Sequence, residues 1–331
     1  MKKKIALVTG GFTGESVVSF KSADFVESQL DRSKYDVYKI VILKESWYFL
    51  DTNAAKHPVD KNDFSILINN NKILFDAAFI MIHGSPGEDG KLQGYFDLIG
   101  LPYTSCDALT SSLTMNKGYS KAIVDGINGL NIARSIQLFE NSDDAANQVI
   151  SNLIFPLFIK PNNGGSSIGM SKVKLSSELK EALKIAFNED QQVLVEEFVE
   201  GREFSIGVYK NHQGIQVLPA TEVIPSNDFF DFEAKYTPGA TEEITPGRMN
   251  EEEKGRVERI VRDIYLKLNC KGMVRIDYFL QKETSNFYFI EINTIPGQTA
   301  QSFIPQQVRA AGLNISEFYG NLVEMALEKQ V

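Results

Sequence analysis

The chain has 331 residues, of which 43% are hydrophobic and 23% are charged, and its formal net charge is −9. This length exceeds that of one small core and fits two or three domains, and the composition is that of a soluble globular protein. The acidic balance disfavours a nucleic-acid-binding surface, which needs clustered lysine and arginine.

The sequence predicts neither a membrane segment nor a disulfide framework. The apolar run after the N-terminal lysines is too short for a signal peptide, and no stretch is long enough to span a bilayer. We therefore expect a cytoplasmic protein without a membrane partner. Cys106 and Cys270 lie far apart and form no metal-binding motif. We expect them to be buried free thiols in a reducing compartment.

The first hundred or so residues alternate strands with a helix. An apolar strand at residues 4–9 runs into the Gly10-Gly11 turn, and residues 17–30 are compatible with a helix. Further strands are predicted at residues 35–42 and 76–83, the second followed by a glycine-rich loop. This alternation predicts an α/β domain with a doubly wound parallel sheet. Ligands bind such sheets at the carboxyl ends of the strands, where both glycine-rich loops fall.

The remaining elements form two further regions. The second region, from about residue 109, has a helix at 115–124, a strand at 155–161 and a strand with a turn at 193–201. The third has a strand at 203–209, a helix at 250–268 and closing strands at 272–280 and 287–293. Between them, residues 224–249 are polar and rich in proline and glycine. A loop of this length is often a functional lid.

The two closing strands carry a candidate metal site. Asp277 follows Arg275 by two residues, so both side chains face one side of a strand, and Glu291 and Asn293 are related in the same way. If the strands are neighbours, Asp277, Glu291 and Asn293 form a cluster of oxygen ligands that suits Mg²⁺ and substrate phosphates. The alternative is a solvated strand face, which the apolar flanking residues disfavour.

Two lysines are candidates for binding phosphate. Lys160 ends a strand beside the loop at residues 162–169, whose small residues let backbone N–H groups approach an anion, and Lys117 lies in the helix predicted at residues 115–124. The loop lacks the GxxxxGK[ST] pattern, which disfavours a P-loop nucleotide site. A loop of this kind is as often a simple connector.

Three glutamates could surround a nucleotide base and its ribose. The strand end at Glu196, Glu197 and Val199 offers backbone groups to an adenine edge, and Glu203 could accept hydrogen bonds from ribose hydroxyls. A glutamate pair is, however, more often a solvated face.

The N-terminal loops add two candidates. Glu15, just after the glycine turn, could hold a substrate ammonium or could be a first-turn acid that complements the helix dipole. His83 could bind substrate or be a hydrogen-bonded loop histidine.

Taken together, these segments resemble the D-alanine–D-alanine ligases. The resemblance covers nearly the whole chain in order, and its most family-specific parts are the Gly-Glu-Asp-Gly loop at residues 87–90 and the Glu-Ile-Asn-Thr-Ile-Pro-Gly segment at residues 291–297. The sequence departs from the family pattern in two places. Asn116 replaces a usual acidic residue, and the pair Ser16-Val17 replaces a pair that is often charged or contains histidine.

The resemblance implies a fold, a reaction and partners. The fold is an ATP-grasp fold with domains at residues 1–107, 108–199 and 200–331, ATP between the second and third, and a lid at about 224–249. The reaction joins two D-alanines through a D-alanyl phosphate for peptidoglycan precursor synthesis. Members of the family are commonly homodimers.

The resemblance also implies a role for each site residue. It assigns the ATP phosphates to Lys117 and Lys160, the rest of ATP to Glu196, Glu197, Val199 and Glu203, and two Mg²⁺ or Mn²⁺ ions to Asp277, Glu291 and Asn293. It assigns the amino acids to Glu15, His83, Lys235 and Ser302, and the oxyanion to Arg275 and the N–H of Gly297. Tyr236 would link through Ser166 to Glu15.

Alternative functions remain open at this point. A D-alanine–D-serine or D-alanine–D-lactate ligase would use the same scaffold, although Tyr236 disfavours the lactate version. A nucleotide-binding module without catalysis would be expected to lack the metal ligands or Lys235, and all of them are present.

Overall fold

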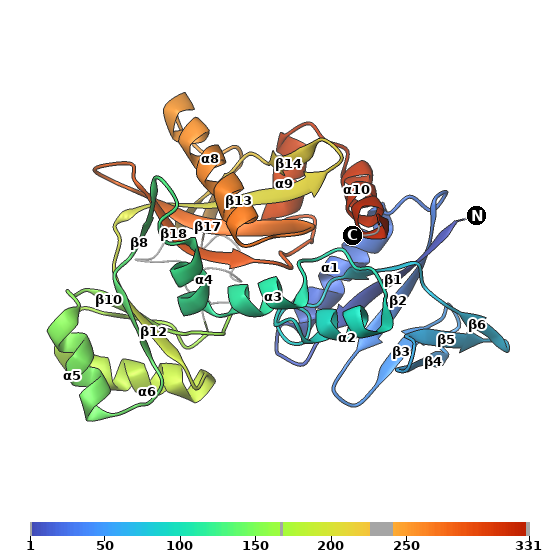
Figure 1. Ribbon diagram of the computed structural model, residues 1–331, viewed down its shortest axis with the longest axis horizontal. Coiled ribbons are helices and arrows are strands. Elements are labelled where there is room, and N and C mark those ends of the chain that lie inside the picture. The colour runs from blue at the N-terminus through green and yellow to red at the C-terminus, as the bar shows by residue number, and fades with distance from the viewer. Residues whose placement is uncertain (1, 166–167, 226–240, 329–331) are drawn as a thin grey trace.

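The computed structural model describes residues 2–165, 168–225 and 241–328, which form three sheets with flanking helices (Figure 1). Ser166, Lys235 and Tyr236, and most of the predicted lid, lie outside these residues. In Figure 1 the N-terminal unit lies at the right and the central unit at the lower left, with the C-terminal unit above the central unit and toward the middle.

The N-terminal sheet has the strand order β6-β5-β4-β3-β2-β1-β7. Three of its strands, β2, β1 and β7, are parallel, as predicted. Helix α1 follows β1 in the chain, and α2 follows β7. The antiparallel strands β3 to β6 extend this sheet, and the sequence did not predict them. The bounds are β1 Lys3–Gly10, α1 Ser16–Gln29, β2 Tyr35–Ile42, β3 Trp47–Leu50, β4 Lys56–Asp60, β5 Ser65–Ile68, β6 Asn71–Ile73, β7 Ala77–Ile80 and α2 Lys91–Ile99.

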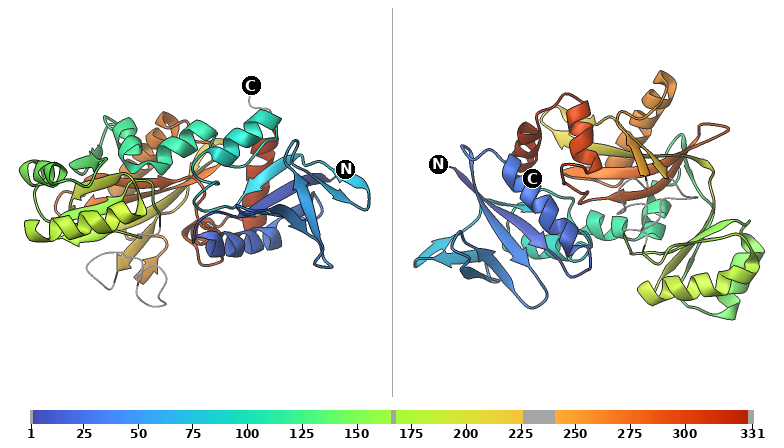
Figure 2. Two further views of the ribbon diagram at one scale, coloured as in Figure 1. Left: turned by 90° about the horizontal axis from the view of Figure 1, so that it is seen from below. Right: turned by 180° about the vertical axis from the view of Figure 1, so that it is seen from behind.

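The C-terminal end of the chain completes the N-terminal core. Helix α10 (Ile315–Leu327) lies beside α1 and the blue strands in Figures 1 and 2. Its residues Phe318, Tyr319 and Leu322 are buried with the apolar side chains of β1 and β7. The rings of Tyr319 and Phe79 meet edge to face with centroids 5.8 Å apart. The first and third units are therefore held together by a shared hydrophobic core.

The central unit is a four-stranded sheet, of order β11-β10-β12-β9, with helices on one face. Its own apolar core runs from Leu138 to Val195 and includes one face of each helix. The predicted strands at residues 155–161 and 193–201 are confirmed as β10 and β12. The bounds are β9 Ser135–Leu138, α5 Asp143–Asn152, β10 Leu157–Pro161, β11 Ser171–Val173, the 3₁₀ turn η1 Ser176–Glu178, α6 Leu179–Glu189 and β12 Val193–Glu197.

The third sheet runs β16-β15-β13-β17-β18-β8, with β14 paired to β13. Strand β8 joins it from an earlier part of the chain, and α3 and α4 contact β18. Side chains of α4 and β8 share the core of this sheet. The domain boundaries at residues 107 and 199 stay predictions. The bounds are α3 Ala108–Met115, α4 Lys117–Val124, β8 Leu130–Ile132, β13 Gly201–Asn211, β14 Gly214–Val217, β15 Thr221–Pro225, β16 Thr241–Ile244, α8 Glu251–Lys267, β17 Met273–Gln281, β18 Phe287–Asn293 and α9 Phe303–Ala310.

Local signals explain several of these boundaries. Asn250 caps α8 in a capping box with Glu253, which fixes the start of the helix predicted there. The helix predicted at residues 115–124 is confirmed as α4, which begins two residues later because Asn116 is extended and caps it; Met115 ends the preceding helix α3. At the edges of the predicted lid, β15 and β16 pair in antiparallel fashion.

Both cysteines are buried free thiols, as expected. They lie at the junction of the first and third units, where the Sγ atom of Cys106 contacts the backbone of Lys271, the neighbour of Cys270. Within the described ranges, no helix is long and apolar enough to cross a membrane.

Candidate active site

One cavity of about 680 Å³ lies where the three units meet. It is bounded by β10 and β12 of the central unit, by β17, β18 and α4, and by loops that follow β1 and β7. Every predicted site residue within the described part of the chain lines it: Glu15, His83, Lys117, Lys160, Glu196, Glu197, Val199, Glu203, Arg275, Asp277, Glu291, Asn293, Gly297 and Ser302. Segments far apart in sequence thus contribute to one site.

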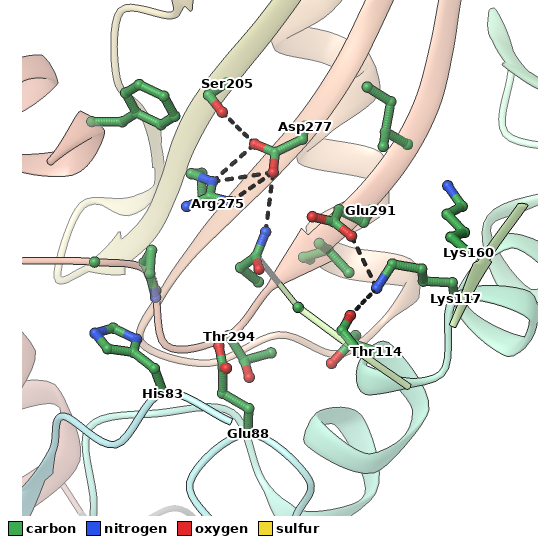
Figure 3. A pocket seen from close by; sticks show the side chains of 18 of the residues that line it. His83, Glu88, Thr114, Lys117, Lys160, Ser205, Arg275, Asp277, Glu291 and Thr294 are labelled. Atoms are coloured by element: carbon green, nitrogen blue, oxygen red, sulfur yellow. Dashed lines mark hydrogen bonds and ion pairs between the residues drawn. The ribbon is translucent and has the colours of Figure 1, made fainter. Parts of the chain in front are cut away.

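The closing strands bring the predicted metal ligands together. Strands β17 and β18 are antiparallel neighbours, with Asp277 directly opposite Glu291 and Arg275 opposite Asn293, so all four side chains share one face. The Asn293 amide donates to Asp277 Oδ2 at 3.1 Å, and the Ser205 hydroxyl donates to Oδ1 (Figure 3). Asp277 is buried, which rules out the solvated-face alternative.

Each of the two carboxylates is paired with a cation. Arg275 donates from Nη2 to Asp277 Oδ2 at 2.7 Å and from Nε to Oδ1 at 2.9 Å. Lys117 Nζ lies 3.2 Å from Glu291 Oε2. Burial lowers the pKa of Arg275, but Asp277 outweighs burial and holds this pKa above its ordinary value. The guanidinium is therefore a permanent positive charge in the cavity.

The donor set fits a magnesium ion. Mg²⁺ prefers oxygen ligands and usually shares its site with substrate phosphates, and these strands offer two carboxylates and one amide oxygen. The described residues contain no group of three or more His, Cys, Asp or Glu side chains arranged for a metal, so the third protein ligand would be the Asn293 amide.

One of the predicted phosphate-binding lysines, Lys160, belongs to a charge cluster around the buried Glu196. Lys160 and Lys121 each form an ion pair with one oxygen of Glu196, which is only 4% exposed. Burial raises the pKa of Glu196, but the two lysine charges outweigh burial and lower it to about 2. Glu196 is therefore ionised and internal, which rules out a solvated face at this position. Lys117 Nζ also donates to the carbonyl of Gly164 in the glycine-rich loop.

The strand end after Glu196 forms another wall of the cavity. Glu197 accepts from the N–H of Ile154 at 2.9 Å, which fixes its side chain. The N–H of Phe198 donates to the carbonyl of Pro156 at 3.0 Å, so this backbone donor is occupied within the protein. Val199 and Glu203 line the cavity beside it.

Glu15 lies between two loops at the amino end of α1. A Cβ atom added at Gly84 would lie 2.7 Å from one of its carboxylate oxygens, and one added at Gly165 would lie 2.9 Å from the other. The side chain makes no capping hydrogen bond to α1. Glu15 therefore lines the cavity, and it also stands at the N-cap position of α1, where a carboxylate complements the helix dipole.

His83 is buried, and both of its ring nitrogens are hydrogen bonded. Nδ1 lies 2.8 Å from the carbonyl oxygen of Ile295, and Nε2 lies 3.0 Å from the Ser22 hydroxyl. Burial lowers the pKa of His83 to about 4, although the bond to Ile295 opposes this. The ring is therefore neutral at pH 7. A carbonyl can only accept, so Nδ1 carries the proton and Nε2 accepts from Ser22.

The lowered pKa of His83 predicts a loss of stability in mild acid. An unfolded histidine titrates near pH 6.5, so the unfolded chain binds more protons than the folded chain between about pH 6.5 and 4. This contribution to stability is complete above pH 6.5 and falls by about 3 kcal/mol as the pH falls to 4. We expect urea unfolding to show this loss in the parent chain and not in His83→Asn. An identical pH profile for the two proteins would contradict it.

Sequence reasoning missed four polar residues of the site. Lys121 lies one helical turn after Lys117 in α4, and this spacing was a usable signal. Ser205 and Ser22 carried no such signal, because each acts through a partner distant in sequence. Glu88 lies in the Gly-Glu-Asp-Gly loop, but its own contact was not predicted, because its partner Ile295 is 207 residues away. Burial and the nearby Glu15 carboxylate raise the pKa of Glu88 to about 8.

Comparison with known proteins identifies the family. The model described as D-ala D-ala ligase N-terminus matches residues 4–106, and the model described as D-ala D-ala ligase C-terminus matches residues 128–324. The chain belongs to the D-alanine–D-alanine ligase family. A D-alanine–D-alanine ligase of Parabacteroides distasonis is 44% identical over 330 residues, which are 100% of this chain and 99% of that relative. One of Azobacteroides pseudotrichonymphae is 42% identical over 97% of this chain and 99% of the relative.

Solved structures of this family share the fold. The VanG D-Ala:D-Ser ligase from Enterococcus faecalis has a TM-score of 0.88 and 32% identity, covering 98% of this chain and 100% of that one. The D-alanyl-alanine synthetase A from Vibrio cholerae has a TM-score of 0.88 and 28% identity, covering 98% of each chain. The ATP-grasp fold is confirmed, and the chain is a ligase of the D-alanine–D-alanine ligase family, whose members use ATP and generally Mg²⁺.

Proposed function

We propose that the chain ligates two D-alanines to D-alanyl-D-alanine, with release of ADP and phosphate, for the synthesis of peptidoglycan precursors. The main support is that one cavity is lined both by the cations Lys117 and Lys160 and by Glu15, Gly297 and Ser302. The first set suits ATP, and the second suits amino acids. A carboxylate does not acylate an amine unless it is activated, and a site with both ends can couple the two steps.

ATP would lie between the central and C-terminal units. Lys117 and Lys160 would bind its phosphates, Glu196, Glu197 and Val199 would border the adenine, and Glu203 would accept from the ribose. On binding, phosphate oxygens would share the lysines that Glu196 and Glu291 hold in this structure.

Asp277, Glu291 and Asn293 would hold two Mg²⁺ ions, or Mn²⁺ in their place. Such ions offset the negative charge of the phosphates when bound. Arg275 contributes a fixed positive charge beside them. These groups favour attack of a carboxylate oxygen on the γ-phosphorus of ATP.

The amino-acid end would hold the two D-alanines. Glu15 would bind the ammonium group of the first. Ser302, the residue before α9, would bind the carboxylate of the second, where the helix amino terminus also favours negative charge. The amine of the second attacks the acyl phosphate of the first, and phosphate leaves with the former carboxylate oxygen. Arg275 and the Gly297 N–H stabilise the oxyanion of this step.

Removal of the metal is expected to abolish turnover. EDTA should stop phosphate release and added Mg²⁺ should restore it. Glu291→Gln should raise the Mg²⁺ concentration for half-maximal rate by at least about tenfold, because a ligand charge is lost. Glu283→Gln, in an exposed turn, is the matched control and should leave that concentration unchanged. If the two variants depended equally on Mg²⁺ concentration, Glu291 would not be a metal ligand.

A competition assay tests the choice of second amino acid. One structural neighbour is a D-Ala:D-Ser ligase, so D-serine is a specific alternative. With ATP, Mg²⁺ and equal concentrations of D-alanine, D-serine and D-lactate, we expect D-alanyl-D-alanine as the main product. A main product containing D-serine or D-lactate would favour the alternative ligases. ATP binding without D-alanine-dependent release of ADP would favour a non-catalytic module.

A further inference from the structure

The loop at residues 294–302 carries Gly297 and Ser302, and side chains from the N-terminal unit hold it. In Figure 3, His83 and Glu88 lie across the cavity from Asp277, next to Thr294 at the start of this loop. The contacts are made to the backbone of Ile295 and Gln298, which flank Pro296 and Gly297.

His83 and Ser22 form one hydrogen-bonded chain across the loop. His83 donates from Nδ1 to the carbonyl of Ile295 at 2.8 Å, and its Nε2 accepts from the Ser22 hydroxyl at 3.0 Å. The same hydroxyl oxygen accepts from the N–H of Gln298 at 3.1 Å. Both side chains are buried, and Ser22 is fully so. These two hydrogen bonds leave neither ring nitrogen of His83 available to a ligand.

Glu88 holds the same loop from a second direction. Its Oε1 accepts from the N–H of Ile295 at 3.3 Å, and its Oε2 accepts from the N–H of Gly84 at 2.7 Å. Both backbone groups of Ile295 are therefore bound by side chains of the N-terminal unit. Within the described residues, no acceptor binds the N–H of Gly297, and Gly297 lines the cavity.

We propose that Ser22, His83 and Glu88 are positioning residues that fix the Gly297 N–H for the oxyanion, and that His83 does not bind the amino acid. This inference rests on the proposed function. Oxyanion stabilisation depends on a preset donor position, and a displacement of about 1 Å can cost about 100-fold in rate. The backbone of a loop can hold such a position only when its flanking groups are fixed.

Steady-state kinetics of Ser22→Ala test the proposal. This substitution leaves the Gln298 N–H and the His83 Nε2 without a partner and adds no bulk. We expect kcat to fall about 10- to 100-fold, while KM for ATP and for D-alanine changes less than about twofold, because the loss is confined to the transition state. Ser111→Ala is the matched control, since Ser111 is equally buried and donates to the carbonyl of Cys106, away from the loop. This control should retain the parent kcat.

A second variant covers the case in which Ser22→Ala does not fold. Glu88→Gln keeps the side-chain size but places an amide N–H₂ against a backbone donor, and it should show the same split between kcat and KM. The proposal is overturned if the folded variants match the Ser111→Ala control. It is also overturned if they raise KM for D-alanine at unchanged kcat, which indicates a substrate ligand. Failure of the parent chain to form dipeptide would instead refute the proposed function.

Discussion

Replacing Arg275 with alanine is expected to lower kcat by about 100-fold or more. The guanidinium is a permanent positive charge in the cavity, and removal of one oxyanion donor costs about 3 kcal/mol of barrier. The substitution also leaves Asp277 without its bidentate partner, although Ser205 and Asn293 still donate to it. The measurement is the rate of D-alanine-dependent phosphate release at saturating ATP and D-alanine.

Arg32→Ala is the control for this substitution. Arg32 pairs with Glu27 on the surface at 3.0 Å, with its side chain half exposed, and exposed pairs contribute little to stability. We expect this variant to retain the parent kcat. Near-normal turnover of a folded Arg275→Ala enzyme would contradict the role proposed for Arg275.

Replacing Glu196 with glutamine is expected to lower the free energy of unfolding by about 3 kcal/mol or more. The substitution removes the carboxylate that Lys121 and Lys160 both contact, and it leaves a buried and a largely buried like charge side by side. Removal of one member of a buried ion pair costs more than the pair contributes, because the remaining charge stays desolvated. Urea unfolding of the protein without ATP measures this loss.

Glu200→Gln is the matched control for Glu196→Gln. Glu200 pairs with Lys282 at 3.2 Å, and both side chains are about 70% exposed (70% and 73%). Solvent screens this pair, so the variant should unfold at the same urea concentration as the parent chain. If Glu196→Gln were equally stable, the cluster of Glu196 and two lysines would carry no structural role.

Much of the site was predictable because its residues follow simple strand and loop rules. Alternation along β17 and β18 places Arg275 with Asp277 and Glu291 with Asn293, and strands adjacent in sequence usually pair. The first two parallel strands were also predictable, because an apolar run followed by a glycine turn and a helix is typical of the start of a βαβ unit.

Contacts between distant segments were not predictable from local patterns. His83 and Ile295 are 212 residues apart, and no periodicity links them. The position of α10 was also not predictable, because an apolar helix face could pack against any of the cores. Nor did the sequence indicate that Lys121 and Lys160 pair with Glu196 and allow its burial. The strands β3 to β6 were missed because they are only three to five residues long, and β4 and β6 are largely exposed, so the hydrophobic alternation is weak. Ser166, Lys235 and Tyr236 stay predictions.

The most direct test of the reaction follows one oxygen atom. D-Alanine labelled with ¹⁸O in its carboxylate is incubated with the chain, ATP and Mg²⁺, and the phosphate and dipeptide are analysed by mass spectrometry. Attack of the carboxylate on ATP predicts one labelled oxygen in the phosphate for each D-alanyl-D-alanine formed. Unlabelled phosphate, or ATP hydrolysis without dipeptide, would contradict activation of D-alanine as an acyl phosphate.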